Sequence, residues 1–379
     1  LAAARRVPPL AARRAGPVDG GVASFGGGAG DEAARACSQR ASRNAPILTN
    51  AAGRHGLVTH ADGAGPRVPA DPTTPDVAGA RTSRRRTPLL DLAATARYPP
   101  RVTDARDPDR TVVSCLMVTL PSPQRLSYFR RSVADYCRQT HPARELVVVV
   151  DRGDPEARAE AIGHLASLRR DDIRVVEPAD KLTLGALRNV SIAEARGDAL
   201  CVWDDDDMHH PARVATQLRE MTRAGARALV LEEALQYFPA TRTLLWTRWR
   251  EIASRGLPGT LMFRRSEALR YPEAGPDAAR SEDMAGIAQL QSAGAFCPMA
   301  GAPHLYVYVS HGANTWDDGH HATIARDLAI PQARLRRNEA LMRRGIAPFD
   351  FGPGDLTVKG RDGVAFVIAG KPDREQGPG

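Results

Sequence analysis

The chain has 379 residues, 42% of them hydrophobic, which is enough for two or three domains with a sizeable core. It contains no run of 18 apolar residues, which excludes a membrane-spanning helix, and no apolar segment follows the first arginines, so no secretory signal is expected. The five cysteines are scattered, odd in number and free of any Cys-x-x-Cys pair, which argues against a disulfide framework or a zinc cluster and favours a reducing cytoplasm.

The net charge of +8 is concentrated in one part of the chain. Residues 1–110 carry 17 Arg, no Lys and 10 acidic residues, a net charge of +7, which leaves about +1 for the remainder. This Ala-, Gly-, Pro- and Arg-rich segment shows no lasting helix or strand period, so we expect it to be disordered. Because the basic excess does not belong to a folded surface, nucleic-acid binding is not expected.

From residue 111 onward, apolar runs alternate with helical periods. Strands are predicted at 112–119, 145–150, 173–176 and 199–203, and helices at 126–137, 155–168 and 184–195. This alternation is typical of an α/β fold, in which a parallel sheet has helices on both faces. Later elements are helices at 211–224, 281–292 and 326–344, strands at 228–231, 243–247, 259–263 and 305–309, and a hairpin at 356–369.

Four consecutive carboxylates, Asp204 to Asp207, follow the apolar strand at 199–203. Continued strand alternation would project Asp204 and Asp206 together and turn Asp205 away. Two carboxylates about 4 Å apart repel by roughly 4 kcal/mol at an effective dielectric near 20. Oxygen ligands favour a hard cation, so the run predicts a Mg²⁺ or Mn²⁺ site, with a solvated acidic loop as the alternative.

Three segments follow one another in an informative order: the strand at 146–150 with Asp151, the segment Gly185-Ala186-Leu187-Arg188-Asn189, and the acidic run. This order resembles family 2 glycosyltransferases of the GT-A fold over about residues 111–315. The resemblance implies a single, mostly parallel sheet sandwiched by helices, with a Rossmann-like nucleotide-binding half and an acceptor half. It places the transferase domain at 111–325, after the disordered region, and leaves 326–379 as a C-terminal helix, a possible hairpin and a disordered tail.

The resemblance also implies roles for individual residues. Ser281-Glu282-Asp283 opens a predicted helix, whose N-terminus favours ionised carboxylates. Asp283 is then the catalytic base and Glu282 an acceptor contact. The donor-binding residues are Asp151, Lys181, Arg188, Asp204 and Asp205, and the metal ligands are Asp206, Asp204, Asp207 and His311.

The resulting hypothesis is a metal-dependent, inverting glycosyltransferase that uses Mn²⁺ or Mg²⁺. Its partners would be a nucleoside diphosphate sugar donor and a hydroxyl-bearing acceptor, whether glycan, lipid or protein. The Gln-x-x-Arg-Trp motif of processive synthases does not follow Asp283, so transfer is expected to be non-processive. We expect a cytoplasmic protein, either free or peripheral to a membrane.

Two other interpretations stay open. The first is a metal-dependent phosphohydrolase that uses the acidic run together with His209 and His210. The second is a non-catalytic, transferase-like domain that binds glycans or a partner.

Overall fold

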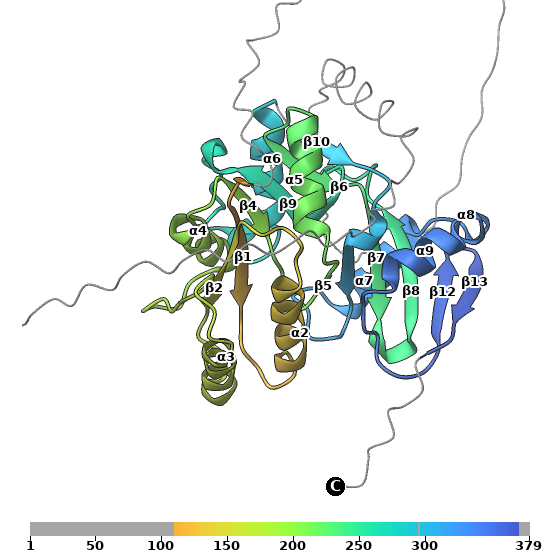
Figure 1. Ribbon diagram of the computed structural model, residues 1–379, viewed down its shortest axis with the longest axis horizontal. Helices are drawn as coiled ribbons and strands as arrows, with labels where there is room; N and C mark the ends of the chain where they lie inside the picture. The colour runs from red at the N-terminus through yellow and green to blue at the C-terminus, as the bar shows by residue number, and fades with distance from the viewer. Residues whose placement is uncertain (1–109, 295, 371–379) are drawn as a thin grey trace, which may run out of the picture. The chain divides into compact units, whose positions relative to one another are not determined.

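The computed structural model describes residues 110–294 and 296–370 (Figure 1). The predicted disorder of the N-terminal region and of the C-terminal tail concerns residues that lie outside these ranges. All of the described residues belong to one compact unit.

A seven-stranded sheet contains the strands predicted from the first half of the folded sequence. Its order is β10-β6-β9-β4-β1-β2-β3, and four of its six strand pairs are parallel. The strands are β1 (Val113–Thr119), β2 (Arg144–Val150), β3 (Ile173–Val176), β4 (Ala199–Val202), β6 (Ala228–Leu231), β9 (Leu257–Arg264) and β10 (Phe296–Met299). The predicted α/β class and mostly parallel sheet are confirmed.

Helices cover both faces of this sheet because its strands are apolar on both sides. Val113, Cys115 and Met117 of β1 pack in one cluster with α2, α3 and α5, while Leu116 faces the opposite side, in a cluster with Ile287 of α6. Helix α4 contacts β1 and β2. The helices are α2 (Leu126–Cys137), α3 (Pro155–Ser167), α4 (Leu184–Glu194), α5 (Arg213–Arg223) and α6 (Glu282–Ser292).

Local sequence signals define the helices that border the site. In α2, Leu126, Phe129, Val133 and Tyr136 recur at helical spacing and are all buried. Helix α4 begins after Thr183, whose hydroxyl accepts a hydrogen bond from the backbone N–H of the third helical residue.

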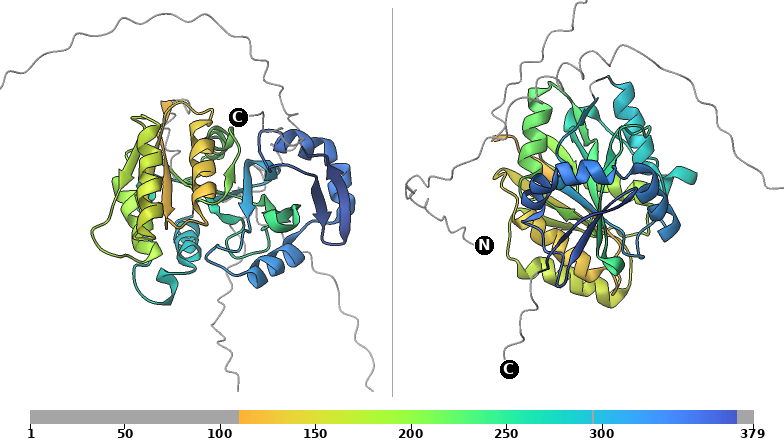
Figure 2. Two further views of the ribbon diagram at one scale, coloured as in Figure 1. Left: turned by 90° about the horizontal axis from the view of Figure 1, so that it is seen from below. Right: turned by 90° about the vertical axis from the view of Figure 1, so that its right-hand side faces the viewer.

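A second, six-stranded sheet was not predicted. Its order is β13-β12-β8-β7-β11-β5, and helices α8 (Gln332–Arg337) and α9 (Glu339–Ile346) lie beside its β12–β13 end (Figures 1 and 2). Its strands are β5 (Met208–His209), β7 (Glu233–Phe238), β8 (Thr243–Arg248), β11 (Tyr306–Val309), β12 (Leu356–Gly360) and β13 (Gly363–Ile368). The predicted hairpin at 356–369 is the antiparallel pair β12–β13. Because β12 also pairs with β8, the segment after residue 326 shares a sheet with earlier strands. The predicted boundary between a domain at 111–325 and a segment at 326–379 stays a prediction.

The single helix predicted over 326–344 is wrong. The structure has three helices in this part of the chain: α7 (Asp318–Leu328), α8 (Gln332–Arg337) and α9 (Glu339–Ile346). Pro331 lies between the first two, and proline cannot continue a helix because it lacks the backbone N–H.

A buried arginine joins α5 to the large sheet. Arg213 is fully buried, and its guanidinium donates to the carbonyl of Val202 in β4 (2.9 Å) and of Gly259 in β9 (3.1 Å). The same group lies over the rings of Trp203 and Tyr306, 5.3 and 4.8 Å from their centroids. One side chain therefore fixes the end of β4 relative to β9.

We expect Arg213→Met to lower the free energy of unfolding by about 3 kcal/mol or more, because hydrogen bonds to a charged donor contribute roughly 1.5–3 kcal/mol each and their buried acceptors would stay unpaired. Urea unfolding followed by circular dichroism measures this loss. Arg219→Met, on an exposed position of the same helix, is the control and should change the value by less than about 0.5 kcal/mol. Equal effects of the two substitutions would contradict the structural role of Arg213.

Candidate active site

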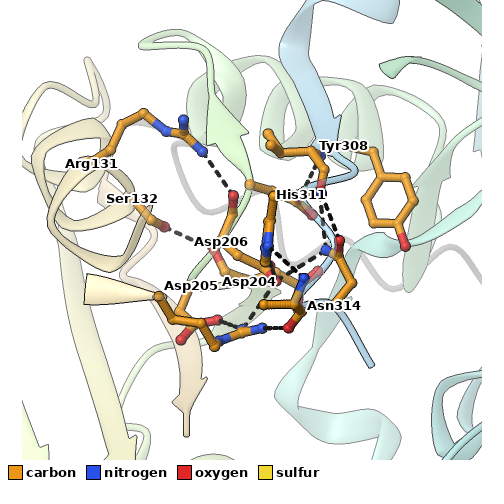
Figure 3. A network of polar contacts seen from close by, with 12 residues as sticks. Arg131, Ser132, Asp204, Asp205, Asp206, Tyr308, His311 and Asn314 are labelled. Atoms are coloured by element: carbon orange, nitrogen blue, oxygen red, sulfur yellow. Dashed lines mark hydrogen bonds and ion pairs between the residues drawn. The ribbon is translucent and has the colours of Figure 1, made fainter. Parts of the chain in front are cut away.

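Helix α2 holds the backbone of the acidic run in place. Ser132 Oγ donates to the carbonyl of Asp204 (2.8 Å), and the guanidinium of Arg131 donates to the carbonyl of Asp206 (2.8 Å) (Figure 3). Strand β4 has already ended at Val202, so the run is not extended. The carboxylates are therefore presented from an irregular turn just beyond the carboxyl end of a strand, where open α/β sheets place their ligands.

Two of the four carboxylates share one arginine. The guanidinium of Arg125 lies 2.6 Å from Asp205 Oδ1 and 3.0 Å from Asp206 Oδ2. Because the Asp205 and Asp206 carboxylates share Arg125, the prediction that Asp205 turns away from its neighbours is wrong. The alternation that it assumed holds only within a strand, and this strand ends before the run begins.

The other two carboxylates share a tyrosine. The hydroxyl of Tyr306 contacts both Asp204 (2.8 Å) and Asp207. The second oxygen of Asp207 accepts the backbone N–H of Val309 (2.7 Å), so both of its oxygens are engaged by protein donors. Gly259 packs against this pair, since a Cβ there would lie only 2.3 Å from Asp204 Oδ2.

The four carboxylates do not ionise alike. Burial alone would raise the pKa of Asp206, but Arg125 and His311 outweigh it and hold the pKa at about 2. Burial, followed by the charges of Asp206 and Asp204, raises the pKa of Asp207 well above its ordinary value. Asp206 is therefore the carboxylate of the run that stays ionised most readily.

Arg188 connects the run to the N-terminus of α6. Its Nε lies 2.8 Å from Glu282 Oε1, and its Nη2 lies 3.6 Å from Asp204 Oδ1. Burial would lower the pKa of Arg188, but Asp204 and Glu282 raise it, so the guanidinium is charged. Burial and, next, the charge of Glu282 raise the pKa of Asp283 to about 6.

These side chains surround one cavity of about 540 Å³. Seven of the ten residues predicted for the site line it: Arg188, Asp204, Asp205, Asp206, Asp207, Glu282 and Asp283. The structure thus brings together residues that lie up to 95 positions apart in the sequence.

Asp151 and Lys181 do not line this cavity. Asp151 follows β2 and is buried, and its Oδ1 has no hydrogen-bond partner within 110–294 and 296–370. Lys181 is exposed in the segment before α4. Their predicted contacts with a donor stay predictions.

His311 contacts the run without lining the cavity. Its Nε2 lies 3.1 Å from Asp206 Oδ2, and its ring stacks on Tyr128 with 4.2 Å between centroids. Its Nδ1 accepts the backbone N–H of Ala313 (3.2 Å), which assigns the proton to Nε2. In this arrangement His311 is a hydrogen-bond donor to Asp206, and metal binding through Nε2 would require the other tautomer.

The carboxylates fit a metal that takes few protein ligands. Within the described part of the chain, no three His, Cys, Asp or Glu side chains form a ready cation cage. Mg²⁺ and Mn²⁺ commonly use only one or two carboxylates and complete their shell with substrate phosphates and water. Asp204 and Asp206, partly exposed in the cavity, match that mode better than Asp207 does.

Sequence reasoning missed Arg125, Arg213 and Tyr306. Arg125 lies 80 positions before Asp205, and Tyr306 lies 102 positions after Asp204, so no local spacing connects them to the acidic run. Arg213 stands at the start of a polar helix, where arginine is normally exposed. Four buried carboxylates need compensating groups from elsewhere in the chain. That need is the signal that could have prompted a search for these three residues.

Solved structures of low sequence identity resemble the chain. TarS of S. aureus in complex with UDP-GlcNAc is 14% identical, with a TM-score of 0.43, over 63% of this chain and 67% of TarS. The mannosyltransferase PcManGT of Pyrobaculum calidifontis, in complex with GDP-Man and Mn²⁺, is 18% identical, with a TM-score of 0.42, over 64% of this chain and 69% of that enzyme. Among curated proteins, none matches this sequence.

The family comparison covers the part of the chain that forms the sheet and the acidic run. Residues 117–264 match the model of glycosyl transferase family 2. This segment extends from β1 to the end of β9 and includes Asp151, Arg188 and all four carboxylates of the run. Residues 117–264 of this chain therefore form a glycosyl transferase family 2 segment.

Proposed function

We propose that the cavity transfers a sugar from a nucleoside diphosphate donor to a hydroxyl acceptor, with inversion, with the help of Mn²⁺ or Mg²⁺ and one sugar at a time. The observation that carries this proposal is the position of Arg188 between Glu282 and Asp204. It joins a helix N-terminus bearing a candidate base to the acidic run, inside one cavity. Asp283 is the proposed base.

The environment of Asp283 suits a base that works near neutral pH. A carboxylate with a pKa of about 6 is ionised at pH 7 and still takes up a proton readily. Glu282 is held by Arg188, while Asp283 accepts only the N–H of its neighbour Met284 (2.7 Å) among the described hydrogen bonds. Asp283 is thus free to accept the proton of an acceptor hydroxyl.

The diphosphate would lie beside the acidic run and its two arginines. Asp204 and Asp206 would hold the metal, which supplies positive charge next to the departing diphosphate. Arg125 and Arg188 add fixed positive charge at the same wall of the cavity. The unpaired, buried Oδ1 of Asp151 supports a contact with the donor's nucleoside.

The proposed cytoplasmic location is supported by the cysteine pattern alone. No described helix is long and apolar enough to cross a membrane.

The structure gives less support to a phosphohydrolase. That reaction would use His209 and His210 beside the acidic run. His209 is fully buried, and its two ring nitrogens contact the carbonyl of Asp204 (3.0 Å) and the guanidinium of Arg213 (2.6 Å). Neither histidine lines the cavity.

A nucleotide panel tests the donor and the metal together. We expect one nucleoside diphosphate, with Mn²⁺, to stabilise the protein by about 2.7 kcal/mol when present at 100 times its dissociation constant. Thermal unfolding with and without metal measures this. Asp206→Asn should abolish the effect, whereas Asp180→Asn, an exposed acid outside the cavity, should preserve it. The absence of stabilisation by any nucleotide would reject the proposed donor class.

Replacement of the base separates chemistry from binding. Asp283→Asn should lower kcat by about 10²–10⁴-fold, the usual contribution of a general base, while nucleotide stabilisation persists. Release of the nucleoside diphosphate measures turnover. Asp277→Asn, an exposed acid shortly before α6, is the control. Full activity of Asp283→Asn would remove this residue from the base role.

The pH profile should report the same group. Only ionised Asp283 accepts a proton, and its pKa is about 6. We therefore expect kcat/KM to be constant above about pH 7 and to fall about tenfold per pH unit well below pH 6. An acidic limb near the ordinary aspartate pKa of about 4 would contradict this assignment.

A further inference from the structure

Two groups of residues line the cavity. The first, called here the charged wall, is the acidic run with Arg125 and Arg188, and the second, the apolar wall, belongs largely to one hydrophobic cluster. The apolar wall consists of Trp249, Ile252, Leu257, Pro258, Ile324 and Leu328. The proposed donor is charged and polar along most of its length, so we expect it to bind at the charged wall. No ligand is yet assigned to the apolar wall.

Three segments that lie far apart in the sequence build the apolar wall. The turn after β8 contributes Trp249 and Ile252, and the start of β9 contributes the next two residues. Ile324 and Leu328 are four positions apart on α7, so they project from the same face of that helix, toward the cavity. Within this wall, Ile252, Pro258 and Leu328 are partly exposed, whereas Trp249, Leu257 and Ile324 are buried.

The apolar wall reaches the proposed base, because Pro258 and Asp283 line one small pocket. Met284 lines the cavity directly after Asp283, and both lie in the first turn of α6. Trp316 lines the cavity as well and is 37% exposed, with its ring stacked on His320 at 4.6 Å between centroids. Apolar surface therefore lies both next to the base and at an exposed part of the lining.

We propose that the acceptor is a hydroxyl carried by an apolar body, such as an alkyl chain, with the hydroxyl at Asp283 and the apolar body along this wall. The inference rests on the proposed function of the same cavity. An acceptor that is polar throughout would leave the wall facing water, whereas an alkyl chain would bury it. Apolar burial of one methylene strengthens binding by about fourfold.

Calorimetric titration of the full chain with n-butyl, n-hexyl and n-octyl β-glucoside, below micelle-forming concentrations, tests the wall without any donor. We expect the dissociation constant to fall by about fourfold per added methylene. Leu328→Asn and Ile252→Asn, at partly exposed positions of the wall, should flatten this dependence. Val367→Asn is the matched control, because Val367 is 45% exposed and lies outside the cavity.

Two results would overturn the inference. One is a dissociation constant that does not change with chain length. The other is a chain-length dependence that survives in both wall variants, because the alkyl chain would then bind elsewhere. Circular dichroism of each variant verifies that it is folded.

The nucleotide panel separates this inference from the proposed function. If the glucoside series binds as expected and no nucleotide does, the transferase proposal fails and the apolar site stands. If a nucleotide binds and the glucoside series is flat, the acceptor inference alone fails. Asp283→Asn should retain the chain-length dependence, since the wall and not the base binds the alkyl chain.

Discussion

Four adjacent carboxylates at the edge of the large sheet set the main constraint on this structure. At about 4 Å and an effective dielectric near 20, each close pair would repel by roughly 4 kcal/mol. Arg125 offsets this for Asp205 and Asp206, and the hydroxyl of Tyr306 bridges the other two. The compensating groups come from residues outside the acidic run, so neutralising the run requires the surrounding chain to be folded around it.

Arg188 extends the same electrostatic network to α6. Arg188 pairs with Asp204 and Glu282. Asp283 lies next to Glu282, and its pKa is raised first by burial and second by the charge of Glu282. One arginine thus positions the helix and sets part of the electrostatic environment of the proposed base. Gly185, three residues earlier, allows α4 to approach this region, because a Cβ there would lie 1.9 Å from the carbonyl of Pro272.

Local patterns predicted the parts of the fold that local forces determine. The period of α2 and the valine-rich β2 could be read directly, as could the ordered motifs that end in Asp204–Asp207. The second sheet could not, because its pairing of β8 with β12 joins strands more than 100 positions apart. Seven predicted site residues do meet in the cavity. Their partner Arg125 was missed for the same reason as the second sheet, because it lies 80 positions from Asp205. The orientation of Asp205 failed because a strand period was extended into a turn.

The pairing of β8 with β12 has a consequence for how the molecule is made. Tyr306 opens β11, which joins β8 through β7, and β8 gains its other neighbour only from residues 356–360. During synthesis, residues 117–264, the family 2 segment, are therefore complete before Tyr306, whose hydroxyl bridges two of their carboxylates, has been added. Asp204 and Asp207 lack their shared tyrosine until residue 306 has emerged and β11 can pair with β5 and β7. Assembly of the site is thus a late event in the biogenesis of this protein.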